Sequence, residues 1–195
     1  DKIIPGMLMA AARLDIPTVF LPGGCTLSAP PFGKKLRSDT TSISEGLGKY
    51  TKGEISYEEL QDLTQVCAPS CGSCQFMGTA NTMSVLGEAL GLGLCGSGLI
   101  PAVYNERRRC AFRSGEKAVE LVQKHITARK IMTWEAIENA IMVLMAVGGS
   151  TNAVIHTCAI AYELGFAPKK VMEAFDKYSG IIPHIAAVDP ASLIY

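Results

Sequence analysis

Three cysteines stand within eight residues of this chain: Cys67, Cys71 and Cys74. The positions around them, residues 65–75, are rich in Gly, Pro and Ser, so this stretch is predicted to be an irregular loop whose short side chains can converge. Thiolates are preferred ligands of zinc, copper(I) and iron–sulfur clusters. The stretch therefore predicts a metal-binding loop between two helix-forming segments.

The spacing C-x-x-x-C-x-x-C is compatible with several kinds of protein. Enzymes that bind a cluster and S-adenosylmethionine use it, but they usually carry an aromatic residue where Ser73 stands, and a strand before the loop. A zinc ribbon needs a second cysteine pair, which Cys95 and Cys110 do not form. A thioredoxin-like pair of Cys71 and Cys74 would also follow a strand. Packing of small buried thiols is the remaining alternative, and we adopt it for the four cysteines outside the loop.

Composition and charge exclude several classes of protein. With 48% hydrophobic and 18% charged residues over 195 positions, the chain is expected to be globular. Its 18 acidic and 18 basic residues cancel, so no broad positive field favours nucleic acid or an anionic membrane. No apolar run reaches the roughly 18 residues of a membrane span. The seven scattered cysteines do not resemble a secreted disulfide framework, which favours the cytoplasm or an organelle matrix.

Helical periodicity dominates the pattern of apolar residues. The predicted helices cover residues 7–14, 56–66, 78–90, 101–125, 133–147, 152–164 and 168–178. Ser56 and Glu59 have the spacing of a capping box at the start of the second helix. Buried strands are predicted at residues 17–22, which include β-branched residues and precede two glycines, and at residues 185–188. Residues 26–38 lack clear periodicity and are predicted to form a surface excursion.

These elements predict an α/β fold, in which helices pack around a mainly parallel sheet. No repeat or low-complexity linker marks an internal boundary, so residues 1–195 are expected to form a single domain. The chain opens on Asp1 without an initiator methionine and ends at Tyr195, so we expect it to be part of a longer protein.

Residues 148–152, Gly-Gly-Ser-Thr-Asn, are a second stretch that could carry chemistry. They lie between two predicted helices, and Ser150, Thr151 and Asn152 are candidates for a loop that binds an anion at the start of the next helix. The alternative is a helix C-cap followed by an N-cap.

Asp1 and Lys2 are a third candidate, because they place a carboxylate beside an amine. Such a pair would bind Mg²⁺ only if the lysine were converted to an oxygen donor, and taken alone the two residues read as a solvated terminus. His156 is interpreted as a hydrogen-bonded packing residue, because no second histidine lies at metal-binding spacing.

Six motifs occur in one order along the chain. They are DKxxPGxxMAA at residues 1–11, IPTVFxxGG at 16–24, GxIS at 53–56, CGSCxxMGTANTM at 71–83, EALGL at 88–92 and VGGSTNAVIH at 147–156. Together they resemble the dihydroxy-acid dehydratase and 6-phosphogluconate dehydratase family, over nearly the whole chain. Residues 97–103 and the following Glu106 and Arg107 are more similar to the branched-chain dihydroxy-acid branch than to the sugar-acid branches.

The resemblance implies a hydro-lyase that removes the C3 hydroxyl and the C2 proton of a 2,3-dihydroxy acid to give a 2-oxo acid. It also implies two cofactors: an iron–sulfur cluster, [2Fe–2S] or [4Fe–4S], acting as a Lewis acid on the departing oxygen, and Mg²⁺ holding the carboxylate and the C2 oxygen. The small-molecule substrate would be the acid of branched-chain amino-acid biosynthesis. The alternative within the family is an aldonate or 6-phosphogluconate.

Carried over residue by residue, the resemblance gives Cys74 as the cluster ligand and Cys71 as the second candidate. Asp1 and Lys2 would hold Mg²⁺, with the lysine carboxylated at its Nζ atom. The catalytic base, a serine, is expected in a C-terminal domain, so no catalytic residue is assigned within this chain. The chain would then be an incomplete N-terminal domain of a larger two-domain enzyme, which the resemblance implies is a homodimer.

Overall fold

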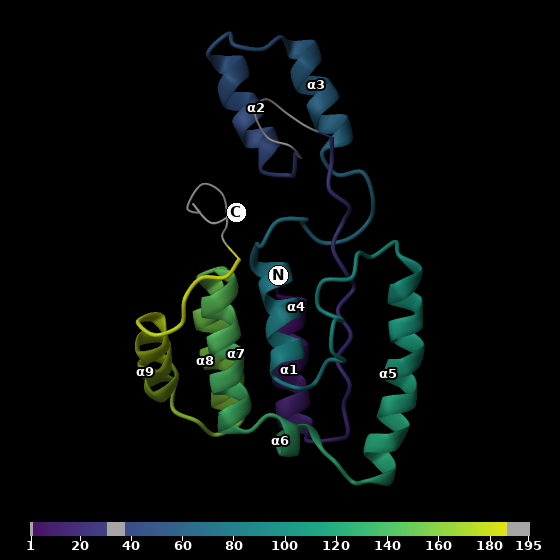
Figure 1. The fold of residues 1–195 in the computed structure, drawn as a ribbon, viewed down its shortest axis with the longest axis vertical. Helices are drawn as coiled ribbons and strands as arrows, with labels where there is room; N and C mark the ends of the chain where they lie inside the picture. Colours follow the sequence, from purple (N-terminus) through teal and green to yellow (C-terminus); the bar gives the residue numbers. More distant parts are fainter. Residues whose placement is uncertain (1, 31–37, 187–195) are drawn as a thin grey trace.

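The computed structural model describes residues 2–30 and 38–186, and within them the chain is built of helices joined by irregular segments (Figure 1). The helices are α1 (Ile3–Leu14), α2 (Ser42–Thr51), α3 (Tyr57–Val66), α4 (Thr79–Ala89), α5 (Asn105–Gln123), α6 (Ala128–Ile131), α7 (Trp134–Val147), α8 (Asn152–Glu163) and α9 (Pro168–Ser179). None of these helices is long and apolar enough to span a bilayer.

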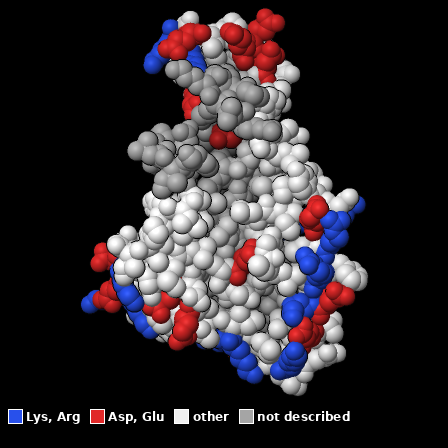
Figure 2. Space-filling model, in the orientation of Figure 1, with Lys and Arg blue, Asp and Glu red and all other residues white. Residues whose placement is uncertain are grey.

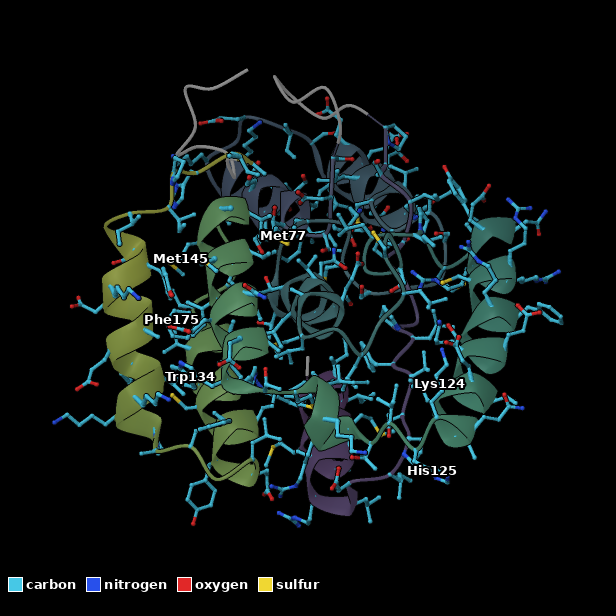
Figure 3. All side chains as sticks on the ribbon, turned by 60° about the horizontal axis from the view of Figure 1, so that its bottom comes forward. Met77, Lys124, His125, Trp134, Met145 and Phe175 are labelled. Atoms are coloured by element: carbon cyan, nitrogen blue, oxygen red, sulfur yellow. The ribbon has the colours of Figure 1, made fainter. Side chains whose placement is uncertain are left out.

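A bundle of α1, α4, α7, α8 and α9 contains the core (Figure 1). Helix α4 packs against α1, α7 and α8, and it is buried on most of its surface. The largest fully buried apolar side chains of the bundle are Leu8, Met83, Leu86, Ile137, Ile141, Leu144, Ile160 and Val171. Figure 3 shows Trp134, Met145 and Phe175 along the contact between α7 and α9. Aliphatic and aromatic burial of this kind supplies most of the stability of a helical domain.

Two parts lie outside the bundle. The α2–α3 hairpin stands at one end of the molecule, and α5 runs along the side opposite α9 (Figure 1). The predicted capping box of α3 is confirmed: Glu59 N donates to Ser56 Oγ at 3.1 Å, and Ser56 N donates to Glu59 Oε2 at 2.7 Å. These bonds satisfy two backbone N–H groups that an uncapped helix would leave without partners.

The predicted α/β fold is wrong, because the described residues contain no β-strand and no sheet. The apolar run at residues 17–22 is extended, but its backbone has no neighbouring strand. Phe20 N donates to Leu92 O at 2.8 Å, and Ala128 N donates to Ile16 O at 3.1 Å. Extended pairing is limited to isolated bridges such as the parallel one between Cys25 and Ser73. The described architecture is therefore all-α.

The other predictions about the fold have mixed outcomes. Helices predicted at residues 133–147, 152–164 and 168–178 are confirmed to within a residue or two. Helix α5 begins at Asn105, four residues later than expected, and α2 was not predicted at all. Two expectations fall partly outside the described residues. These are the surface excursion, at residues 31–37, and the second strand, at residues 187–188. Ile185 and Ala186 form no strand, and both donate to Ala146 O.

Candidate active site

The first turns of α1, α4 and α8 lie at the same end of the bundle, which we call the three-helix end (Figure 1). In each helix the residue before the first turn supplies no side-chain cap to the backbone N–H groups. A helix N-terminus carries about half a positive charge, so three together favour an anionic ligand. Figure 2 shows few charged side chains over the middle of the side of the molecule that it presents.

The loop between α7 and α8 is tied to the first turn of α4. Gly148 ends α7 in a left-handed conformation with φ 62°, as the C-cap alternative predicted. The next residues do not act only as an N-cap: Asn152 Nδ2 donates to Thr79 Oγ1 at 2.9 Å, and Ser150 Oγ lies 3.2 Å from the same oxygen. Ser150 N also donates to Thr82 Oγ1 at 3.0 Å. The candidate anion loop is thereby fixed beside the helix that follows the cysteine loop.

The cysteine loop is held from both sides. On one side, Ser73 N donates to Gly24 O at 3.0 Å, and Thr26 N donates to Ser73 O at 2.8 Å. On the other side, Asn81 Nδ2, in the first turn of α4, donates to Cys74 O at 2.7 Å. Asn81 Oδ1 accepts from Ser73 Oγ at 3.0 Å, so one carboxamide fixes two consecutive residues of the loop. The backbone that carries the Cys74 thiol is therefore well defined.

The three cysteines of this loop have different environments. Cys67 is 1% exposed, and its thiol lies 3.7 Å from Thr64 O. Cys71 is exposed, and Cys74 is half-buried. Across residues 2–30 and 38–186, no group of three or more His, Cys, Asp or Glu side chains is arranged to hold a metal ion. The loop by itself therefore does not form a three-thiolate site. Of its cysteines, Cys74 is partly accessible to solvent and has its backbone fixed by Asn81.

Lys2 also reaches the three-helix end. Its Nζ atom lies 3.5 Å from His156 Nε2, although the two residues are 154 positions apart in the chain. His156 is half-buried on α8, and burial lowers its pKa, with the nearby charge of Lys2 acting in the same direction. The imidazole is therefore neutral near pH 7, and it can serve as a hydrogen-bond partner of the Lys2 side chain. Asp1, the other predicted magnesium ligand, lies outside the described residues.

Comparison with known proteins identifies the family. The family described as "Dihydroxy-acid/6-phosphogluconate dehydratase N-terminal" matches residues 1–195. The chain belongs to this family. Among its dehydratase relatives, the dihydroxy-acid dehydratase of Thermodesulfovibrio yellowstonii is 48% identical over 195 residues. The dihydroxy-acid dehydratase of Halothermothrix orenii is 46% identical over 195 residues, and that of Methanospirillum hungatei is 48% identical over 191 residues.

These matches cover 100%, 100% and 98% of this chain, but only 35%, 35% and 34% of the three dehydratases. The chain thus spans about a third of the length of the relatives that it matches. Membership in the dehydratase family confirms the resemblance drawn from the six motifs. It also removes the basis for the radical S-adenosylmethionine and zinc or redox alternatives, which rested on the cysteine spacing alone.

Residues that the sequence did not mark as functional complete the candidate site. Thr79, Asn81 and Thr82 all come from the first turns of α4 and hold the two loops together. All three lie inside the motif at residues 71–83, directly after the cysteines, so their position in that motif was the available signal. His156 was interpreted as a packing residue, and its contact with Lys2 was not foreseen.

Proposed function

We propose that this chain is the N-terminal part of a hydro-lyase that converts a 2,3-dihydroxy acid into a 2-oxo acid. The proposal rests above all on how three groups meet at the three-helix end. The cysteine loop and the loop at residues 148–152 are both hydrogen-bonded to α4, and Lys2 contacts His156 of α8. Membership in the dehydratase family supports the same conclusion. We assign the protein to the dihydroxy-acid dehydratases of branched-chain amino-acid biosynthesis, because its named relatives are dihydroxy-acid dehydratases.

In this proposal Cys74 is the residue of this chain that holds an iron–sulfur cluster. Its thiol fits the role because it is half-buried in an irregular loop and, among the described residues, accepts no hydrogen bond that a metal would have to displace. Cys71, which is exposed, remains the second candidate, and the buried Cys67 is assigned to packing. When bound, the cluster would supply a Lewis acid for the hydroxyl that leaves from C3.

Lys2 fits the magnesium role in its carboxylated form. A carbamate on Nζ would present oxygen atoms to Mg²⁺, which prefers oxygen ligands, and it would replace an ammonium that repels the cation. His156, whose Nε2 atom lies 3.5 Å from Nζ, can donate a hydrogen bond to such a carbamate and keep the side chain in place. We propose Asp1 as the accompanying carboxylate ligand, following the resemblance.

The loop at residues 148–152 is proposed to bind the substrate carboxylate. Ser150 and Asn152 are engaged with Thr79, so they shape the loop. Thr151 is exposed, and its hydroxyl has no hydrogen-bond partner among the described residues, so it is the side chain of this loop that is free to reach a ligand. The N-terminal dipole of α8 beside it favours a negative group, and Ser150 Oγ accepts a hydrogen bond from Asn152 N at 3.4 Å in the same turn.

The chain's own residues therefore bind and orient the substrate, and the proton at C2 is removed by a group outside them. We assign that base, a serine, to a C-terminal domain, as the resemblance implies. The homodimer and the cytoplasmic or organellar location belong to the same proposal.

Substrate turnover tests this proposal. The protein in its full natural length, reconstituted with iron, sulfide and Mg²⁺, should dehydrate 2,3-dihydroxy-3-methylbutanoate, and removal of either metal should abolish turnover. D-Gluconate, 6-phosphogluconate and pentonates serve as competing substrates in parallel assays. Preference for one of these sugar acids would move the protein to the other branch of the family. Absence of turnover with every acid in the loaded protein would refute the hydro-lyase assignment.

A further inference from the structure

Arg107, in the first turn of α5, is a buried cation without a carboxylate partner. It is 8% exposed. Among the described residues no carboxylate lies within ion-pair distance of it, and its Nε atom is buried without a hydrogen-bond partner. Its Nη1 atom donates to Ser97 O at 2.9 Å, and its Nη2 atom donates to Ile100 O. A planar guanidinium can hold two carbonyl groups at once in a fixed geometry, which an ammonium cannot reproduce.

Glu88, near the end of α4, holds the same loop from another side. Its Oε1 atom accepts a hydrogen bond from Gly96 N at 2.6 Å, and its Oε2 atom accepts one from Gly98 N at 2.7 Å. Two charged side chains from two different helices thus fix residues 96–100 by four charge-assisted hydrogen bonds to the backbone.

The segment at residues 24–26 lies between this loop and the cysteine loop. Ala102 N donates to Cys25 O at 2.9 Å, and a Cβ atom placed on Gly24 would lie 2.6 Å from Ile100 O. The opposite side of the same segment makes the two backbone hydrogen bonds with Ser73. A displacement of the loop at residues 96–102 is therefore transmitted through one layer of backbone to the residue next to Cys74.

We propose that Arg107 and Glu88 are positioning residues for the Cys74 thiol. They act through the loop at residues 96–102 and the segment at residues 24–26, and they touch neither substrate nor cluster. The description of this thiol as a cluster ligand rests on the proposed function, whereas the mechanical connection rests on the hydrogen bonds and close contacts described above.

Cysteine reactivity in the metal-free protein of full natural length tests the connection. In Arg107→Lys and Glu88→Gln, we expect the rate of alkylation of Cys74 by iodoacetamide to rise about tenfold, which corresponds to about 1.4 kcal/mol, the order of one charge-assisted hydrogen bond lost from the loop. Mass spectrometry reports the rate for each cysteine separately. Cys67, 1% exposed, is the internal reference, because its buried thiol becomes reactive only when its surroundings open.

Arg109→Lys is the matched control, because this arginine lies on the same helix with its side chain 65% exposed, and within residues 2–30 and 38–186 its ion pair is with Glu106 alone. It should leave the rate at Cys74 unchanged. The proposal is overturned if Cys74 in both test variants reacts as in the wild type, or if Cys67 accelerates along with it, which indicates general destabilisation. Should Arg107→Lys fail to fold, Glu88→Gln decides, because it loosens the same loop through α4.

A second readout connects the positioning role to the cluster. In reconstituted protein challenged with a chelator, both test variants should lose the visible absorption of the cluster about tenfold faster than the wild type and Arg109→Lys. If the wild-type protein takes up no iron, the proposed function fails. The alkylation rates then still decide the positioning role, so the two failures are distinguishable.

Discussion

Replacement of Gly72 by alanine should test the tight approach beneath the cysteine loop. Gly72 has φ 134°, and a Cβ atom at this position would lie 2.4 Å from Cys25 C and from Thr26 N. Ordinary contact begins at 3.4 Å, so the two segments must separate by about 1 Å. The two hydrogen bonds with Ser73 would then be lost, at about 1 kcal/mol each. With about 1–2 kcal/mol for the strained backbone, the free energy of unfolding should fall by about 3–4 kcal/mol.

Thermal unfolding followed by circular dichroism measures this effect. For a chain of this size, 1 kcal/mol corresponds to roughly 2–4 °C, so the Tm of Gly72→Ala should fall by about 10 °C. Gly53→Ala is the control, since Gly53 also has a positive φ, 72°, but has no atom within 4 Å of the added Cβ. It should cost only the backbone strain, about 1 kcal/mol. Equal losses in the two variants would refute the close approach.

Two further perturbations have defined outcomes. Thr79→Val removes the oxygen that accepts a hydrogen bond from Asn152 Nδ2, so the free energy of unfolding should fall by about 1–3 kcal/mol. Urea titration measures this loss, and an unchanged midpoint would contradict the hydrogen-bonded connection between the two loops. Hydrogen bonds from Lys117 and Lys124 lower the pKa of Glu120 from 4.5 to about 2. Its stabilising contribution is therefore present above pH 4.5 and lost as the pH falls through about 2, and Glu120→Gln should remove it. An NMR titration that places this carboxyl near 4.5 would contradict the pairing.

The helices could be predicted because their signals are local. Periodic apolar residues and caps such as Ser56 and Glu59 lie within a few positions of one another, and the structure confirms them. Local signals of this kind could not show whether a sheet forms. The run at residues 17–22 has the composition of a buried strand, but a strand also needs a partner from elsewhere in the chain. Here Phe20 N bonds to Leu92 O, and the residues that flank the run, Ile16 and Cys25, accept from Ala128 N and Ala102 N.

The site was partly predictable for the same reason. Lys2, Ser150 and Cys74 stand in compact motifs, so they could be chosen as candidates from the sequence. What joins them is not local: the hydrogen bond from Asn152 to Thr79 spans 73 positions, and the contact between Lys2 and His156 spans 154. Only the packing of α4 and α8 brings these residues together. The sequence could therefore identify the groups but not the helix that organises them.

Metal content in cysteine variants tests the central claim most directly. Iron and acid-labile sulfide should be measured per polypeptide in the protein of full natural length, reconstituted in parallel as wild type, Cys67→Ala and Cys74→Ala. The account predicts that Cys67→Ala keeps the wild-type content, because that thiol is buried in packing, and that Cys74→Ala loses both iron and sulfide. Wild-type iron and sulfide in Cys74→Ala would contradict it.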